Sequence, residues 1–302
     1  MSRDLKHFLN DQCSRLLRNL PYPIKQKVRG FPSISSRNKK AVVAVLCGQH
    51  QFLEGLWSLS SWMRHLSPVM NAVLLLDGKV SAGEEELFHK LFPDGLLLEL
   101  DAFLAGRSLP PYLNRFVLNN WTAKKLAAVF ELQKEYSVLY SDCDVIAFDY
   151  PSEIIDSIKE NRSAFMCDPV GYDLDPWLTR RAEEAGIPVT NHFNAGLAYV
   201  PQGEMKDSVL KAMLGDWQPH FNSHHAEQTL FSILLDPKVT RPLTPERYAL
   251  SWQGVWLFEK DLDNRSLVCR HYVGPIRHRM YLSAYPFLLN QIMGAGRASS
   301  PS

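Results

Sequence analysis

Apolar and polar positions along residues 41–148 follow two alternating patterns, one typical of strands and one typical of helices. Short apolar runs bounded by Gly or Asp predict buried strands, and longer segments with apolar residues at helical spacing predict helices. The apolar runs span residues 41–48, 71–78, 95–100 and 137–148. The segments with helical spacing span residues 51–66, 81–92 and 119–136. Strands that alternate with helices predict an α/β fold with a mainly parallel sheet flanked by helices.

The second half of the chain follows a less regular pattern. A stretch rich in Gly and Pro interrupts it, and residues 270–281 are polar, basic and aromatic. The elements that its apolar runs predict are strands over 163–168 and 194–201 and helices over 207–214 and 224–235. Three tryptophans of the first half lie in predicted helices and are expected in the core: Trp57, Trp62 and Trp121.

Residues 1–40 differ from the rest of the chain because they carry ten basic residues and only two acidic ones. Their apolar residues recur at helical spacing and predict an amphipathic helix over residues 3–20, which Pro21 and Pro23 end. We favour a helix packed on the domain with a solvated basic face. The alternative is a peripheral membrane contact through this basic segment.

The composition excludes several classes of protein. The 302 residues are 46% hydrophobic and carry a net charge of +1, so we expect a substantial core and no nucleic-acid partner. The five cysteines are scattered without a CxxC pair, which indicates neither a zinc site nor a disulfide framework. Without a signal-peptide core or a membrane-spanning run, we expect a cytoplasmic protein, with peripheral membrane association as the alternative.

Polar residues gather where the predicted strands end. Parallel sheets bind ligands at the carboxyl ends of their strands, and Gly48, Asp77 and the pair Asp142 and Asp144 all fall there. Residues i and i+2 of an extended chain point to the same side, so the two carboxylates can hold a hard cation, Mg²⁺ or Mn²⁺. The alternative is a polar strand end with solvated acids.

Four stretches in order resemble the GT-A glycosyltransferases, whose donors are nucleotide-diphosphate sugars. LYSDCDVIAF (139–148) resembles their strand and DxD motif. Three stretches resemble motifs of the retaining family 8: its Asn-Ala-Gly strand, its acid-Gln helix and its His-x-x-Gly-x-x-Lys segment. They are NHFNAGLAYV (191–200), EQTLFSILL (227–235) and HYVGPIR (271–277). Tyr140-Ser141 before the DxD motif is also similar to family 77, our second choice. The resemblance covers residues 41–282 and implies the GT-A, Rossmann-like fold.

The resemblance implies a metal site made by Asp142, Asp144 and His271. A neutral imidazole is a reasonable third ligand for Mn²⁺. The donor's phosphates and nucleotide would contact Lys125, Gly196, Gly274, Arg277, Gln49 and Asp77. Arg277 stands where the family has Lys, and His278-Arg279 replace the family's Pro-Trp. For Gln49 an ordinary loop, and for Asp77 a turn, is an equal alternative.

The resemblance also implies a sugar and acceptor pocket lined by Asn194, Gly196, Glu227 and Gln228. Because Gln is a poor nucleophile, retention in this family is commonly explained by a front-face displacement. Glu227 is the other carboxylate that could serve as base or transient nucleophile.

We therefore predict a hexosyltransferase that moves a sugar from a nucleotide-diphosphate sugar, a UDP-sugar, with metal dependence and retention of configuration. The acceptor would be a saccharide, a glycolipid or a protein. Two alternatives remain, a catalytically silent carbohydrate- or nucleotide-binding protein on the same scaffold and a sugar-phosphate nucleotidyltransferase. The single Gly after the first strand disfavours the latter. The predicted divisions are the basic extension (1–40), the nucleotide-binding half (41–150), the acceptor half (151–282) and the C-terminal tail (283–302).

Overall fold

The computed structural model of the chain describes residues 22–36, 40–219, 223, 225–250 and 264–295 and five single positions before residue 17. The amphipathic helix predicted over residues 3–20 therefore lies almost wholly outside the described residues. In the part of the chain that is described, no helix combines the length and the apolar character that crossing a bilayer requires.

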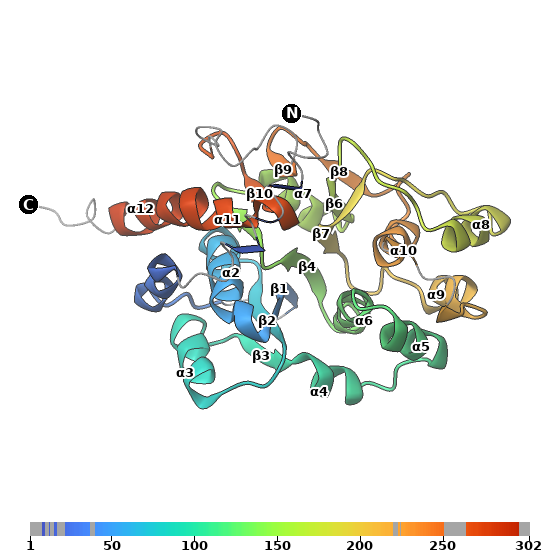
Figure 1. Cartoon of the computed structure of the whole chain (residues 1–302), viewed down its shortest axis with the longest axis horizontal. Coiled ribbons are helices and arrows are strands. Elements are labelled where there is room, and N and C mark those ends of the chain that lie inside the picture. The colour runs from blue at the N-terminus through green and yellow to red at the C-terminus, as the bar shows by residue number, and fades with distance from the viewer. Residues whose placement is uncertain are drawn as a thin grey trace, which may run out of the picture.

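A seven-stranded sheet forms the centre of the molecule, in the order β3-β2-β1-β4-β7-β6-β8 (Figure 1). Its strands are β1 (Ala41–Gly48), β2 (Asn71–Asp77), β3 (Leu96–Glu99), β4 (Ser137–Asp142), β6 (Ala164–Cys167), β7 (Phe193–Val200) and β8 (Arg241–Leu243). The pairs β3–β2, β2–β1, β1–β4 and β6–β8 are parallel, whereas β7 runs antiparallel to both β4 and β6. The predicted α/β fold with a mainly parallel sheet is confirmed, and β7 is the strand that reverses direction.

Helices cover both faces of this sheet (Figure 1). One face carries the 3₁₀ helix η1 (Pro23–Gly30), α2 (Phe52–Leu66), α3 (Ala82–Leu91), α7 (Ser152–Glu160) and α12 (Tyr285–Ala295). The other carries α4 (Leu100–Ala105), α5 (Pro111–Asn119), α6 (Ala123–Leu132), α8 (Pro176–Glu184), α9 (Asp207–Leu214) and α10 (Ala226–Leu234). Alternate residues of β1 enter the two cores, because successive side chains of a strand point to opposite faces. Val43 and Val45 join the first core, and Val42 and Ala44 join the second.

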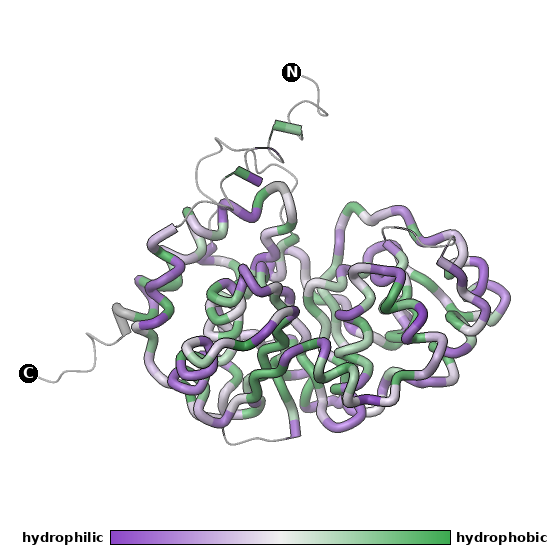
Figure 2. The backbone as a smooth tube through the Cα atoms, turned by 60° about the horizontal axis from the view of Figure 1, so that its bottom comes forward, coloured by the Kyte–Doolittle hydropathy of each residue, from purple (hydrophilic) through white to green (hydrophobic). Residues whose placement is uncertain are grey.

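The hydrophobic residues of the strands lie inside the molecule. In Figure 2 the green, hydrophobic stretches of the tube run through the interior, and purple, hydrophilic stretches dominate the outer turns and helices. Because β1 and β2 are buried on both sides, they appear in the sequence as continuous apolar runs rather than as alternating ones.

A second, three-stranded sheet joins distant parts of the chain. It contains β5 (Val145–Ala147), β9 (Tyr248–Leu250) and β10 (Cys269–His271), with β10 in the middle. His271 pairs with Val145, and the backbone N–H of Tyr272 donates to the carbonyl of Asp144 at 2.8 Å. This pairing carries residue 271 to the end of β4. The chain continues through η4 (Gly274–Ile276), α11 (Arg277–Arg279) and the π-helical turn η5 (Met280–Ala284) into α12.

Three local features differ from the sequence expectations. The helix expected over 119–136 begins only at Ala123, because the Asn120 side chain accepts hydrogen bonds from the backbone N–H and hydroxyl of Thr122 and forms a turn there. Trp121 in that turn is 78% exposed, so its expected core position is wrong, whereas Trp57 and Trp62 are fully buried. Helices α4, α5, α7, α8 and α12 lie in stretches where no helix was predicted.

Candidate functional site

A cavity of about 380 Å³ opens at the carboxyl ends of β1, β2 and β4. Residues from several separate segments line it, among them Gly48, Asp77, Lys125, Asp142, Asp144 and Arg277. This edge of the sheet is where α/β proteins bind ligands, and it is where the polar strand ends were predicted to meet.

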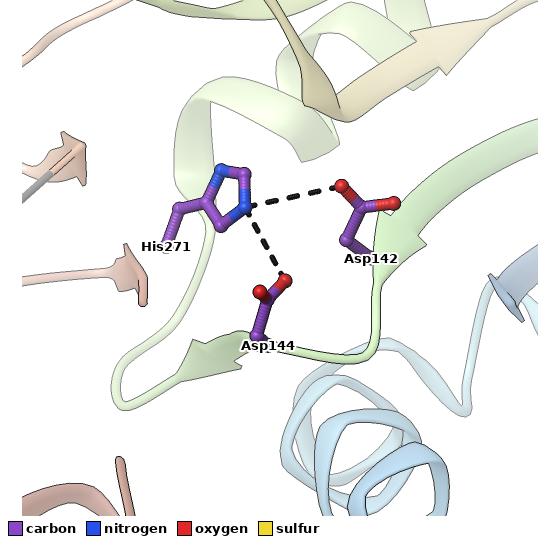
Figure 3. Close-up of side chains that lie close together, drawn as sticks. All are labelled: Asp142, Asp144 and His271. Carbon is purple, nitrogen blue, oxygen red and sulfur yellow. Dashed lines mark ion pairs between the residues drawn. The ribbon is translucent and has the colours of Figure 1, made fainter. Parts of the chain in front are cut away.

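Asp142, Asp144 and His271 converge beside this cavity, and their side chains point toward one another (Figure 3). One ligand atom from each residue lies within 4.8 Å of the other two. His271 Nε2 is 3.3 Å from Asp144 Oδ1 and 3.8 Å from Asp142 Oδ2. Asp144 and His271 are buried, and Asp142 is partly exposed at the end of β4.

The two aspartates converge by a different route from the one expected. Asp142 is the last residue of β4, and the chain turns at Cys143 and Asp144 before β5 begins. Their carboxylates therefore approach across a turn and not along one extended strand. The second sheet then adds His271, which the sequence separates from this turn by more than a hundred residues.

Hydrogen bonds orient the His271 ring. Asn194 Oδ1 accepts the backbone N–H of Gly196 at 3.0 Å, which identifies this atom as the oxygen of the amide. His271 Nδ1 lies 3.0 Å from the same oxygen, so Nδ1 must carry the proton and donate it. In the neutral ring the lone pair of Nε2 then faces the two carboxylates. A metal-bound histidine has this arrangement, with the distal ring nitrogen held by a hydrogen-bond acceptor.

Gly196 makes room for this ring. A Cβ atom at residue 196 would lie 2.3 Å from Cε1 and 2.5 Å from Nδ1 of His271, closer than atoms can approach. The Asn-Ala-Gly stretch of β7 thus supplies both the acceptor for His271 and the space beneath it. Gly196 therefore leaves free the space that the His271 ring occupies against β7.

Asp144 has a cationic partner of its own. The Arg277 guanidinium forms an ion pair and a hydrogen bond with Asp144 Oδ2. Burial acts to raise the pKa of the Asp144 carboxyl, but Arg277 and His271 together outweigh burial and hold that pKa below its usual range. The other oxygen, Oδ1, is buried and accepts no hydrogen bond. Asp142 accepts a 2.5 Å hydrogen bond from the Tyr140 hydroxyl at Oδ1.

The donor atoms suit a divalent cation. Two carboxylate oxygens and one imidazole nitrogen form a set that Mn²⁺ accepts, and Mg²⁺ prefers the oxygens among them. The unused Asp144 Oδ1 and the Nε2 lone pair face the same space, where a cation would offset their mutual repulsion. The residues present therefore fit the metal that the sequence predicted.

Lys125 links this cluster to α10. Its ammonium is 3.2 Å from Glu227 Oε1 and 3.8 Å from Asp142 Oδ2, and all three residues were predicted site residues. Burial raises the pKa of Glu227 to about 7, although Lys125 opposes this shift. The carboxyl can therefore be protonated or ionised near neutral pH.

The other predicted site residues contact residues outside the cluster of Asp142, Asp144 and His271. The amide oxygen of Gln228 accepts the backbone N–H of Ala195, next to Asn194 on β7. Asp77 lines the cavity and forms an ion pair with Lys124 at 2.8 Å. Gln49 donates to Glu84 at 3.1 Å. A Cβ at Gly274 would meet nothing within 4 Å, so no contact among the described residues requires glycine at this position.

Two residues that line the cavity were not predicted as site residues from the sequence. Tyr140 binds Asp142, and Lys124 binds Asp77 and Asp101. Tyr140 stands two positions before Asp142 on the same strand, so the period of two could have indicated their common side. Lys124 carries no comparable local signal, because its partners lie on separate elements of the fold.

No protein-family model matches the chain, and no curated protein sequence matches it. Several solved structures match the structure of this chain. Mouse xyloside xylosyltransferase 1 matches with a TM-score of 0.51 and 12% identity, over 78% of this chain and 98% of that one. An active-site mutant of LgtC matches with a TM-score of 0.51 and 14% identity, over 84% of this chain and 95% of that one.

A third similar structure is WbbM, a bifunctional glycosyltransferase, with a TM-score of 0.50 and 14% identity. It matches 86% of this chain and 53% of its own length, so the chain spans about half of WbbM. Identities this low show the fold alone. The chain has the GT-A fold of these glycosyltransferases, as the sequence resemblance implied.

Proposed function

We propose that this protein transfers a sugar from a nucleotide-diphosphate sugar to an acceptor, in a reaction that depends on Mn²⁺ or Mg²⁺. The observation that carries the proposal is the convergence of Asp142, Asp144 and His271 at the cavity, with the His271 lone pair fixed toward the carboxylates by Asn194. A divalent cation at this point would offset the repulsion between the buried Asp144, the partly exposed Asp142 and the lone pair of the oriented imidazole.

The bound cation would supply positive charge to the departing diphosphate, which is Lewis-acid assistance. Two basic side chains that line the same cavity, Lys125 and Arg277, can bind the donor directly. Lys125 places an ammonium beside Asp142 and Glu227, where it can donate hydrogen bonds to the hydroxyls or phosphates of the donor. Arg277 presents a guanidinium to the same cavity and can bind a phosphate with two parallel hydrogen bonds.

For the transfer itself we propose retention of configuration, on the family resemblance. Asn194, Glu227 and Gln228 come from β7 and α10, which lie in the part of the chain that we predict to be the acceptor half. A protonated Glu227 can donate to a sugar hydroxyl, and an ionised one can accept a proton. The donor we propose is a UDP-hexose, and the acceptor a saccharide, glycolipid or protein.

A second candidate function is a nucleotide- or carbohydrate-binding protein without turnover. The observation that favours it is the ion pair between Arg277 and Asp144, because an arginine already supplies one positive charge to the pair of acids. Such a protein would bind a nucleoside diphosphate without a divalent cation.

The test is a thermal-shift panel of nucleoside diphosphates and nucleotide sugars with Mn²⁺, with Mg²⁺ and with EDTA. A ligand that binds only the folded state raises the melting temperature. We expect UDP to stabilise the protein only with a divalent cation and to lose this effect in Asp142→Asn and Asp144→Asn. Asp156→Asn, on the exposed side of α7, is the matched control and should behave as wild type.

Each outcome separates the two functions. Cation-dependent binding followed by release of UDP from a UDP-sugar supports the transferase. Binding that EDTA leaves unchanged, without turnover, supports the silent binding protein. A well-folded sample that no nucleotide stabilises under any condition contradicts both the transferase and a nucleotide-binding protein.

A further inference from the structure

A second cavity, of about 420 Å³, lies apart from the candidate site on the face of the sheet that α2 and α12 cover. It shares no lining residue with the first cavity. Three parts of the chain form it: the segment after η1, the C-terminal half of α2, and α12, which lies beside α2 in Figure 1. Its volume is in the ordinary range for a small-molecule site.

One wall of this cavity is polar and belongs to α2. Ser60, Arg64 and Ser67 are four and three positions apart, so they occupy one face of the helix and its end. Ser33 and Ser35 add hydroxyls from the opposite segment. Together these polar residues of α2 and of the segment after η1 offer one positive charge and several hydroxyl groups.

Arg64 brings a positive charge to this cavity and has no counter-ion among the described residues. It is half-buried, and no carboxylate of the described residues lies within ion-pair distance of its guanidinium. Among the described residues, its guanidinium forms a hydrogen bond from Nη1 to Gln291 Oε1 at 3.2 Å. The C-terminus of α2 favours a cation by a fraction of a kcal/mol to about 1 kcal/mol, which is less than a buried counter-ion provides.

Gln291 is held in place by a separate contact. Its Nε2 donates to the carbonyl of Phe148 at 3.2 Å, so its oxygen is the atom that faces Arg64. The Gln291 side chain therefore holds the Arg64 guanidinium at the cavity, and the other N–H groups of Arg64 can still donate hydrogen bonds. The arrangement is that of an arginine oriented toward a ligand.

Ser60 provides an independent indication of a ligand. It is 1% exposed and lines the same cavity, and its hydroxyl has no hydrogen-bond partner. A buried hydroxyl without a partner costs about 1–3 kcal/mol. A ligand with an acceptor atom near Ser60 and Arg64 would satisfy both groups at once.

The apolar residues that line the cavity indicate the chemical nature of the rest of the ligand. They are Phe31, Pro32, Ile34 and Ile292, and they offer no charge. A sugar or a free inorganic ion would leave this apolar surface without contact. The lining therefore suits a molecule with an anionic head and an apolar body.

We propose that this cavity is a second binding site, for a small amphipathic anion whose carboxylate or phosphate binds Arg64 and Ser60 and whose apolar body lies on Phe31, Ile34 and Ile292. A soluble acyl or alkyl anion and the headgroup region of an anionic lipid share this chemistry. The proposal does not depend on the donor site, because the two cavities have no residue in common.

The test uses octyl phosphate, below its critical micelle concentration, as the probe in a thermal-shift titration of the full chain. Inorganic phosphate and 1-octanol are the matched controls, because each carries one half of the probe. We expect octyl phosphate alone to raise the melting temperature by several degrees at concentrations far above its Kd. A calorimetric titration would then give the stoichiometry, which we expect to be one.

Three variants show where the probe binds. Arg64→Gln should abolish the shift and weaken binding at least tenfold, and Ser60→Ala should reduce it. Arg180→Gln removes an exposed arginine of α8 and should bind as wild type. UDP with Mn²⁺ should stabilise Arg64→Gln as it does wild type, so failure of this site and failure of the donor site are distinguishable.

Binding to vesicles of phosphatidylcholine, with and without phosphatidic acid, distinguishes a soluble anion from a lipid headgroup as the ligand. Binding to the acidic vesicles that Arg64→Gln loses indicates a lipid headgroup, and binding of octyl phosphate alone indicates a soluble ligand. An equal shift in wild type and Arg64→Gln, an equal shift from 1-octanol or from phosphate, or no shift at all would overturn the proposal.

Discussion

Gly196 and Asn194 together decide how His271 lies in the candidate metal site. The amide oxygen fixes which ring nitrogen carries the proton, and the missing Cβ lets the ring lie against β7. Neither residue need touch a metal to affect its binding. Supporting contacts of this kind typically change metal affinity 10–100-fold when they are removed.

Gly196→Ala tests this role. The new Cβ would lie 2.3 Å from the His271 ring and must displace it, so we expect Mn²⁺ affinity to fall at least tenfold and stability by about 1–3 kcal/mol. Titration of Mn²⁺ followed by electron paramagnetic resonance measures the affinity. Gly83→Ala, where a Cβ meets nothing within 4 Å, is the control, and unchanged Mn²⁺ binding in Gly196→Ala would contradict the assignment.

Glu227 gives the site a pH dependence whose sign follows from its pKa. Its pKa of about 7 lies above the unfolded value near 4.3, so between these pH values only the folded state holds the proton. The free energy of unfolding therefore falls as pH rises from about 4 to 7. The contribution that is lost is about 3 kcal/mol.

Glu227→Gln cannot ionise and should lack this contribution. We expect its stability relative to wild type to increase by about 3 kcal/mol between pH 5 and pH 8, as measured by urea unfolding at both pH values. Glu183→Gln, an exposed acid of α8, should show no such change. Parallel pH profiles for wild type and Glu227→Gln would show that Glu227 titrates normally.

At the scale of elements, α2 supports the turn that carries the two aspartates. The Ser58 hydroxyl donates to the carbonyl of Val145 at 2.7 Å and lies 3.3 Å from that of Asp142. The Trp62 indole donates to Ser141 at 3.0 Å. One helix therefore holds the backbone on both sides of the turn.

Ser58→Ala removes the donor that these buried carbonyls share. We expect the free energy of unfolding to fall by about 1–2 kcal/mol, measured by urea unfolding without ligand. Ser60→Ala on the same helix is a close control, because the Ser60 hydroxyl has no hydrogen-bond partner and its loss should not lower the free energy of unfolding. Equal costs for the two variants would mean that the Ser58 hydrogen bonds add no stability.

The elements that could be predicted from sequence are those whose signal is local. The strands β1 to β4 appear as apolar runs, and α2 and α3 appear at helical spacing. The direction of β7 and the pairing of β5 with β10 could not be predicted, because they depend on contacts between residues far apart in the chain. The same limit applies to the site. His271 was found by family resemblance, and the ion pair of Arg277 with Asp144 was not predicted.

At the scale of the whole molecule, residues 22–36 belong to the folded domain although they precede its first strand. Val28 and Phe31 are buried in the first core. Lys25 forms a buried ion pair with Glu54 at 2.6 Å, and its carbonyl accepts the Trp57 indole. Residues 22–36 of the predicted basic extension therefore pack on the folded domain.

Two truncations test this packing. Removing residues 1–36 should destabilise the protein by roughly 3–6 kcal/mol, because it exposes the surface that Val28 and Phe31 cover. Removing residues 1–21 should leave the melting temperature within a few degrees of wild type, since the described positions there are exposed. Equal melting temperatures for the two truncations would contradict the packing of residues 22–36.

The central claim is that Asp142, Asp144 and His271 bind a divalent cation together with a nucleoside diphosphate. Its most direct test is the anomalous scattering of manganese from crystals grown with Mn²⁺ and UDP. We predict one peak within coordination distance of all three side chains, with the diphosphate beside it. Bound UDP without manganese at this position, with Arg277 still paired to Asp144, would contradict the account.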